Sequence, residues 1–138
     1  MRSKTKLKLI SLVFAAVLAT ASAVALADPA RQAILDGYAA KAGTKPSPER
    51  GKAFFVATHS DGKPDTASCT SCHGQDPRSG GRTRAGKAIE PMAVSVMPGR
   101  FTDPAKVEKW FGRNCNTVLG RACTDAEKAD FIAFMASQ

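Results

Sequence analysis

Apolar positions in this chain recur mainly at helical spacing. After one continuous apolar stretch near the N-terminus, short apolar groups return at intervals of three or four residues, separated by loops rich in Gly, Pro, Ser and Asp. No segment alternates apolar and polar residues between turn signals as a half-buried strand does. The pattern therefore predicts an all-α protein.

Two helices are expected before the middle of the chain. Asp28 precedes a proline and can cap a helix over about 29–41. Ser47 also precedes a proline and can cap a second helix, on which Gly51 and Phe55 are four residues apart and share one face.

Two more helices are expected in the C-terminal part. Thr102 or Asp103 opens the first of them, which carries an apolar face and stops at Gly112. That face consists of Val107, Trp110 and Phe111. The second begins with a capping-box pattern, Thr124 followed three residues later by Glu127. Its apolar residues are Phe131, Ile132, Phe134 and Met135.

The N-terminal segment 1–27 has the features of a secretory signal. Its first eight residues carry four basic side chains and no acid, and the apolar run that follows ends in Ala25-Leu26-Ala27. A membrane anchor is the alternative, but the run is Ala-rich, is broken by Ser and Thr, and is followed by Asp28 and a proline. We expect cleavage after Ala27, which leaves 28–138 as one periplasmic domain with no stable membrane insertion.

The basic charge of the chain is partly that of the export segment. The formal net charge is +8, and 1–27 contributes four basic residues and no acid, so 28–138 carries +4. Basic residues are not interleaved with aromatic ones as in proteins that bind single-stranded nucleic acid. We therefore expect no nucleic-acid partner.

One motif carries recognisable chemistry. Cys69, Cys72 and His73 form the pattern C-x-x-C-H, by which c-type cytochromes attach haem. Two residues between the cysteines match the separation of the two haem vinyl groups when the segment forms a helical turn, and the adjacent imidazole is the proximal iron ligand. A single motif predicts one covalent haem c.

The remaining cysteines bear on the alternatives to haem, a redox dithiol or half of a zinc site. A zinc site needs a second pair of ligands at similar spacing, and Cys115 and Cys123 are eight residues apart with no His nearby. In an oxidising compartment these two cysteines are expected to pair with each other, with two free buried thiols as the alternative.

With haem included, the chain resembles the class I cytochromes c. In that family an N-terminal helix with a Gly and an aromatic residue four positions later crosses a C-terminal helix bearing aromatics. Gly51 and Phe55 match the first helix, and Phe131 and Phe134 match the second. The resemblance implies helices packed around one covalently bound haem.

The usual sixth ligand of this class is a Met well after the motif. Met97 lies in a Pro- and Gly-bearing loop and is a candidate ligand, whereas Met92 is expected to line the pocket without binding iron. Met135 is expected in the core, because it lies on the C-terminal helix.

More specifically, the sequence resembles the SHP-type cytochromes c, named after the sphaeroides haem protein. The runs that carry this resemblance are FTDPAKVEKWF at 101–111, RNCN at 113–116, LGRACT at 119–124 and EKAD at 127–130. They lie across the C-terminal part of the chain, and together with the haem motif the resemblance covers most of 28–138.

The SHP-type resemblance implies a different sixth ligand, an Asn side chain braced by a disulfide, and this role falls on Asn114. Because an amide oxygen binds ferrous iron poorly, reduction would release it and open a site for oxygen or nitric oxide. The resemblance also implies an electron donor, a dihaem cytochrome c. Alternatives are Asn116 as ligand, Asn114 as a helix C-cap after Gly112, and a plain electron carrier with Met97 as ligand. An enzyme that reduces a small oxygen or nitrogen species is a third possibility.

Three other features are interpreted without a direct role in iron binding. His59, in a Ser/Asp/Gly loop, is expected to be solvated. Trp110 is expected either in the core beside the haem edge or donating to a haem propionate. A basic cluster near the motif is interpreted as a solvated loop, with propionate pairing or the steering of an acidic partner as alternatives. Its members are Arg78, Arg82, Arg84 and Lys87.

Overall fold

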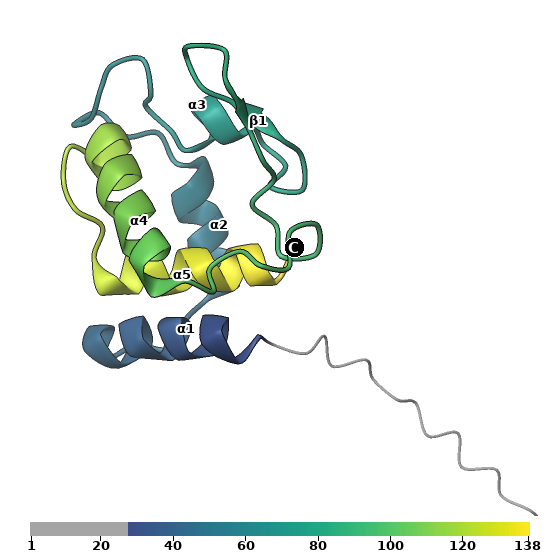
Figure 1. Cartoon of the computed structure of the whole chain (residues 1–138). Helices are drawn as coiled ribbons and strands as arrows, with labels where there is room; N and C mark the ends of the chain where they lie inside the picture. The colour runs from purple at the N-terminus through teal and green to yellow at the C-terminus, as the bar shows by residue number, and fades with distance from the viewer. Residues whose placement is uncertain (1–27) are drawn as a thin grey trace, which may run out of the picture.

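The computed structural model describes residues 28–138, so the predicted export segment 1–27 lies outside the described residues. Helices dominate this range, which confirms the all-α prediction (Figure 1). The elements are α1 (Pro29–Ala42), α2 (Pro48–Val56), α3 (Thr70–His73), β1 (Gly81–Arg82), β2 (Ala88–Ile89), α4 (Pro104–Leu119) and α5 (Asp125–Ala136). The antiparallel pair β1 and β2 was not predicted, because two residues per strand are too few to produce an alternating pattern.

The four longer helices begin where the capping residues predict. The side chains of Asp28, Ser47, Asp103 and Thr124 each accept a hydrogen bond from a backbone N–H in the first turn of α1, α2, α4 and α5. Glu127 accepts in return from the backbone N–H of Thr124, which completes the capping box. The predicted starts of all four helices are thus confirmed.

α4 is longer than its sequence pattern predicts. It does not stop at Gly112 but continues to Leu119, and Gly120 ends it in the left-handed conformation with φ 67°. The helix continues because Cys115 and Val118 extend its buried face beyond Gly112. The interpretation of Asn114 as a helix C-cap is therefore wrong, since Asn114 lies inside α4.

The crossing of α2 and α5 forms the centre of the fold (Figure 1). A Cβ atom on Gly51 would lie 2.0 Å from the carbonyl oxygen of Asp130, so only glycine permits this approach. Phe55 is fully buried and packs against Phe131 and Phe134, with ring centroids 6.2 and 5.9 Å away. The pairing of this Gly and these aromatics, expected from the class I resemblance, is present.

A buried carboxylate ties the same two helices together. Asp130, whose side chain is 8% exposed, accepts hydrogen bonds from the backbone N–H of Ser47 at 2.7 Å and from Arg50 Nε at 2.7 Å and Nη2 at 2.8 Å. Its carboxylate therefore holds the N-terminus of α2 on α5.

Asp130→Ala is expected to lower the free energy of unfolding by about 2–3 kcal/mol, because hydrogen bonds to a charged group are lost and the partly buried N–H of Ser47 is left without its partner. Denaturant unfolding followed by circular dichroism measures the change. Asp36→Ala, at an exposed position of α1, is the matched control and should change it by less than about 0.5 kcal/mol. Equal effects of the two substitutions would contradict the prediction.

α1 packs along α5 and reaches α4 through Tyr38 (Figure 1). The Tyr38 hydroxyl donates to Glu108 at 2.5 Å, and Lys128 of α5 donates to the same carboxylate at 3.0 Å. Burial and this carboxylate raise the pKa of Tyr38, while the Tyr38 hydrogen bond and Lys128 lower the pKa of Glu108. The network fixes the N-terminal half of α4 on α1 and α5.

Within the described range, no helix combines the length and the apolar character needed to cross a membrane.

Candidate functional site

A cavity of about 890 Å³ lies between α4 and the segment that contains α3, β1 and β2. Its size is within the range of about 300–1,000 Å³ that is typical of pockets enclosing a cofactor. Cys69, Cys72 and His73 line it, and so does Asn114 of α4. The cavity thus brings together the haem motif and the Asn to which the SHP-type resemblance gives the role of ligand.

The haem motif forms a single helical turn. The backbone N–H of His73 donates to the carbonyl of Cys69 at 3.1 Å, and Gly74 ends the turn with φ 72°. Cys69, Cys72 and His73 stand at positions i, i+3 and i+4, which share one helical face. A Cβ on Gly81 would lie 2.1 Å from the carbonyl oxygen of Cys72, so β1 passes directly behind this turn.

The electrostatic surroundings of the motif favour neutral side chains. Burial raises the pKa of the Cys69 thiol to about 11, and burial together with the nearby Arg100 guanidinium lowers the pKa of His73. A zinc ligand would need a thiolate, whereas a thioether bond and a neutral imidazole carry no charge. No group of three or more His, Cys, Asp or Glu side chains within 28–138 could hold a metal ion. The residues present therefore fit a covalently attached haem better than a zinc ion.

The opposite wall of the cavity is one stripe of α4. Val107, Trp110, Asn114 and Thr117 follow each other at intervals of three or four residues and all line the cavity. The side-chain amide of Asn114 has no hydrogen-bond partner within the described part of the chain. Asn116 is on a different side of the helix, where its amide nitrogen donates to the Gly112 carbonyl at 2.7 Å. Of the two asparagines, only Asn114 lines the cavity.

The three methionines considered as ligands separate into two groups. Met92 and Met97 line the cavity, whereas Met135 is fully buried in the core, as expected. The loop that follows Met97 is fixed to α1, because Arg31 donates from Nε to the Arg100 carbonyl at 3.0 Å and from its guanidinium to the Pro98 carbonyl. Asn114, Met92 and Met97 therefore share the cavity with His73, and of these Asn114 and Met97 are the two expected as candidate iron ligands.

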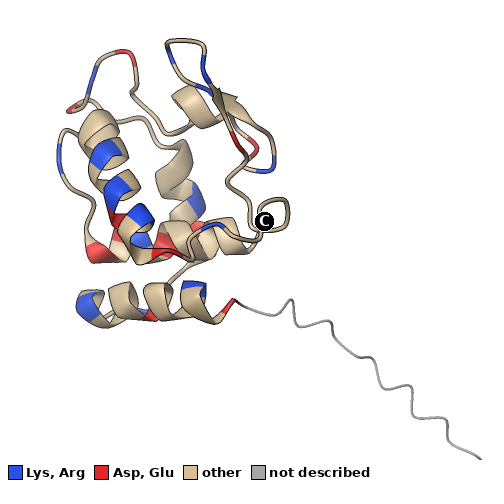
Figure 2. Cartoon of the chain, in the orientation of Figure 1, with Lys and Arg blue, Asp and Glu red and all other residues tan. Residues whose placement is uncertain are grey.

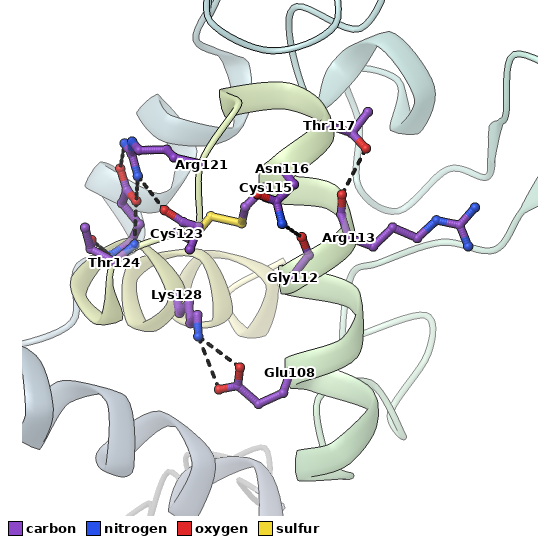
Figure 3. The surroundings of a disulfide bond; sticks show 12 residues. Glu108, Gly112, Arg113, Cys115, Asn116, Thr117, Arg121, Cys123, Thr124 and Lys128 are labelled. Carbon is purple, nitrogen blue, oxygen red and sulfur yellow. Dashed lines mark hydrogen bonds and ion pairs between the residues drawn. A yellow bond between two sulfur atoms is a disulfide. The ribbon is translucent and has the colours of Figure 1, made fainter.

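Cys115 and Cys123 form a disulfide, with Cα atoms 5.5 Å apart (Figure 3). It joins the C-terminal half of α4 to the residue before the N-cap of α5. Figure 3 shows Cys115 directed toward Cys123 on one side of α4 and Arg113 extending from the other side. The disulfide therefore ties the backbone next to Asn114 to α5, and both of its cysteines also line the cavity.

Replacing both Cys115 and Cys123 with Ser is expected to lower the free energy of unfolding by about 2–4 kcal/mol, because the unfolded chain gains conformational freedom. Denaturant unfolding of the haem-containing protein measures the loss. Treating the unsubstituted protein with a phosphine reductant breaks the same bond and should give a loss of similar size. A double variant as stable as the parent chain would show that the bridge contributes nothing.

Of two single residues considered, His59 differs from its expected setting and Trp110 lies at the cavity. His59 is half-buried rather than solvated: its Nε2 atom is buried without a hydrogen-bond partner among the described residues, and its ring packs edge-on against Phe54, with centroids 5.7 Å apart. Trp110 lines the cavity but is 48% exposed, with Lys109 and Arg113 lying 5.8 and 5.7 Å from its ring centre. Trp110 thus lies at the cavity itself, where a haem would cover part of its ring, and its place beside the haem edge stays a prediction.

The basic cluster is exposed, in agreement with its interpretation as a solvated loop (Figure 2). Arg78 pairs with Asp76, Arg84 pairs with Asp65, and Arg82 donates to a backbone carbonyl of the same loop. Lys87 is the member that lines the cavity.

Two cavity residues were not identified from the sequence. Arg100 donates from Nε to the Pro91 carbonyl at 2.9 Å and lines the cavity beside His73. Thr66 is 4% exposed and donates toward the Thr117 carbonyl of α4 at 3.4 Å. Both residues lie in loops without a periodic apolar pattern. Their hydrogen-bond partners are 9 and 51 positions away in the sequence, so no neighbouring residue indicates that they line a cavity.

Comparisons with known proteins agree with this geometry. Residues 41–135 match the family model described as a domain of unknown function, DUF1924. The chain is 52% identical to the cytochrome c-type protein SHP of Cereibacter sphaeroides over 92% of this chain and 97% of that protein. It is 40% identical to cytochrome c'' of Methylophilus methylotrophus over 67% of this chain and 65% of that protein.

Solved structures of these two relatives also superpose on this chain. A structure of oxidised SHP, described as an oxygen-binding cytochrome c, superposes with a TM-score of 0.77 at 55% identity, covering 78% of this chain and 96% of that one. Oxidised cytochrome c'' from Methylophilus methylotrophus superposes with a TM-score of 0.68 at 35% identity, covering 80% and 95%.

The helical fold, the cavity and these relatives define a class I cytochrome c that carries one covalently bound haem c. Within that class, the chain belongs to the family of SHP-type cytochromes c.

Proposed function

We propose that this cytochrome binds a diatomic gas, oxygen or nitric oxide, at its single haem when the iron is reduced. Cys69 and Cys72 hold the haem through thioether bonds, His73 is the proximal ligand, and Asn114 is the sixth ligand of ferric iron. The haem supplies a redox-active iron whose ligand preference changes with its oxidation state. The observation that carries the proposal is that the motif and Asn114 line one cavity from opposite walls.

The chemistry of the two candidate donors favours Asn114 over Met97. An amide oxygen is a hard, weak-field donor that suits ferric iron and binds ferrous iron poorly, so an Asn114 ligand would dissociate on reduction. A thioether suits ferrous iron and would keep the sixth position closed in both states. Because the Asn114 side-chain amide has no hydrogen-bond partner in the described range, its release would break no hydrogen bond to the protein. Oxygen binding by the related SHP supports this choice.

Electrons come from a partner cytochrome, which the SHP-type resemblance indicates is a dihaem cytochrome c. Basic side chains around the cavity support a partner with an acidic surface (Figure 2). They include Lys87, Lys106 and Arg113 in its lining, and Lys109 next to Trp110.

The protein works in the periplasm after cleavage of 1–27 at Ala27, with 28–138 as the haem domain.

Optical and EPR spectra of the oxidised protein test the proposed ligand. High-spin character, or a weak-field sixth ligand, is expected if Asn114 binds ferric iron. A low-spin spectrum with the Met–iron charge-transfer band would instead establish Met97 and a plain electron carrier. Adding carbon monoxide or nitric oxide to the reduced protein tests gas binding, and failure to bind either gas would leave electron transfer as the function.

A further inference from the structure

The segment 61–66 connects the two walls of the haem cavity. It precedes Cys69, the first cysteine of the motif, and lies against the C-terminal end of α4 (Figure 1). The backbone N–H of Lys63 donates to the carbonyl of Thr117 at 2.8 Å, and the Thr66 hydroxyl lies 3.4 Å from the same oxygen. The last carbonyls of a helix have no partner within the helix, and the segment supplies two donors to one of them.

Backbone packs directly on backbone at this contact. A Cβ on Gly62 would lie 2.2 Å from the carbonyl oxygen of Val118 and 2.5 Å from that of Thr117. A Cβ on Gly120 would lie 2.1 Å from the carbonyl oxygen of Asp61. These atoms cannot rotate away as a side chain can, so any added atom must move α4 and the segment apart.

The contact is one helical turn from Asn114. Thr117 follows Asn114 by three residues on the same stripe of α4, and both line the cavity together with Thr66. One residue after Asn114, the disulfide at Cys115 holds the same turn to α5. The backbone that carries Asn114 is therefore fixed from two sides, and one side continues along the chain into the haem motif.

We propose that Gly62 and Thr66 are positioning residues, which set the separation between the turn that carries His73 and the turn of α4 that carries Asn114. Close packing of the segment 61–66 on α4 brings the Asn114 amide within bonding distance of ferric iron. The inference rests on the proposed role of Asn114 as sixth ligand. Loosening the contact weakens that bond while the haem and the proximal ligand stay in place.

Gly62→Ala tests this role through the rate at which cyanide binds the oxidised, haem-containing protein, measured by stopped-flow absorbance. A displacement of α4 by an ångström or so is expected to raise the rate constant by about tenfold to a hundredfold, since positional errors of that size have effects of that order. The ferric spectrum should shift in the same direction, toward the spectrum of Asn114→Ala. Gly112→Ala is the matched control on α4, because nothing lies within 4 Å of its added Cβ, and its rate should stay that of the parent.

Thr66→Val provides a milder test in case Gly62→Ala does not fold. It keeps the shape of the side chain and removes only the hydroxyl, which lies 3.4 Å from both the Lys63 and the Thr117 carbonyl oxygens. The cyanide binding rate is expected to rise by a few fold, in the same direction. A Thr66→Val protein that folds and binds cyanide at the parental rate would overturn the role of Thr66.

A double-mutant cycle separates failure of this inference from failure of the proposed function. In the Asn114→Ala background there is no amide ligand to displace, so Gly62→Ala should no longer change the rate. If Asn114→Ala alone leaves the spectrum and the rate unchanged, the proposed function is wrong. If Asn114→Ala has its effect but Gly62→Ala has none, or accelerates binding equally in both backgrounds, the positioning role is wrong and the ligand assignment stands.

Discussion

His73→Gly is expected to yield a protein that keeps its covalent haem but loses the proximal nitrogen ligand. Cys69 and Cys72 do not depend on His73 for their thioether bonds, so haem staining of the denatured chain should persist. The iron of the folded variant should lose the spectrum of an imidazole-ligated haem completely. Optical and EPR spectra of the purified variant, with the haem content determined on the same sample, measure this outcome.

His59→Gly is the matched control for this experiment, because His59 is the only other histidine of the chain and does not line the cavity. Its spectrum should be that of the parent protein. Added imidazole should restore a nitrogen-ligated spectrum to His73→Gly, since the substitution leaves room where the side chain was. A parental spectrum in His73→Gly, or its loss in His59→Gly, would refute the proximal role of His73.

The parts of this fold that could be predicted depend on residues close together in the sequence. Each longer helix has a side-chain cap next to its first turn, so Asp28, Ser47, Asp103 and Thr124 mark four starts correctly. The haem motif is equally local, because the spacing of its cysteines follows from the geometry of the haem itself. The class of protein and its one haem could therefore be predicted from the sequence alone.

The end of α4 could not be predicted in this way. Gly112 resembles a stop signal, but the helix continues because Cys115 is held by the disulfide and Val118 packs in the core. Tertiary packing outweighs the cost of about 1 kcal/mol for a glycine inside a helix. The end of α4 matters for function, since only the longer helix carries Asn114 along the cavity wall.

The opposite wall of the site also depends on contacts between distant positions. Thr66 is buried beside the carbonyl of Thr117, toward which its hydroxyl donates. Position 62 requires glycine because a Cβ there would collide with the backbone carbonyl of Val118. Neither residue stands in a periodic pattern. For Asn114 itself, resemblance to a family supplied the assignment, and the structure adds that Asn116 lies outside the cavity lining.

Asn114→Ala is expected to have the largest effect on ligand binding of any substitution in α4. The substitution removes the proposed sixth ligand of ferric iron, so an external ligand can bind without prior dissociation of the Asn114 amide. Cyanide should bind the oxidised protein faster by about one to two orders of magnitude, which corresponds to about 1.4–2.8 kcal/mol. The reduced protein should bind carbon monoxide at nearly the parental rate, because Asn114 has already left ferrous iron.

Two matched variants distinguish Asn114 from its competitors. Asn116→Ala removes the same amide one position beyond the disulfide cysteine, where it bonds to the Gly112 carbonyl, and should leave both rates unchanged. Met97→Leu removes the thioether that shares the cavity while keeping an apolar side chain of similar size, and should also leave the ferric spectrum unchanged. A large change of the ferric spectrum in Met97→Leu with none in Asn114→Ala would show that Met97, and not Asn114, is the sixth ligand. In that case the thioether would close the site in both oxidation states, and the protein would be an electron carrier that binds no gas.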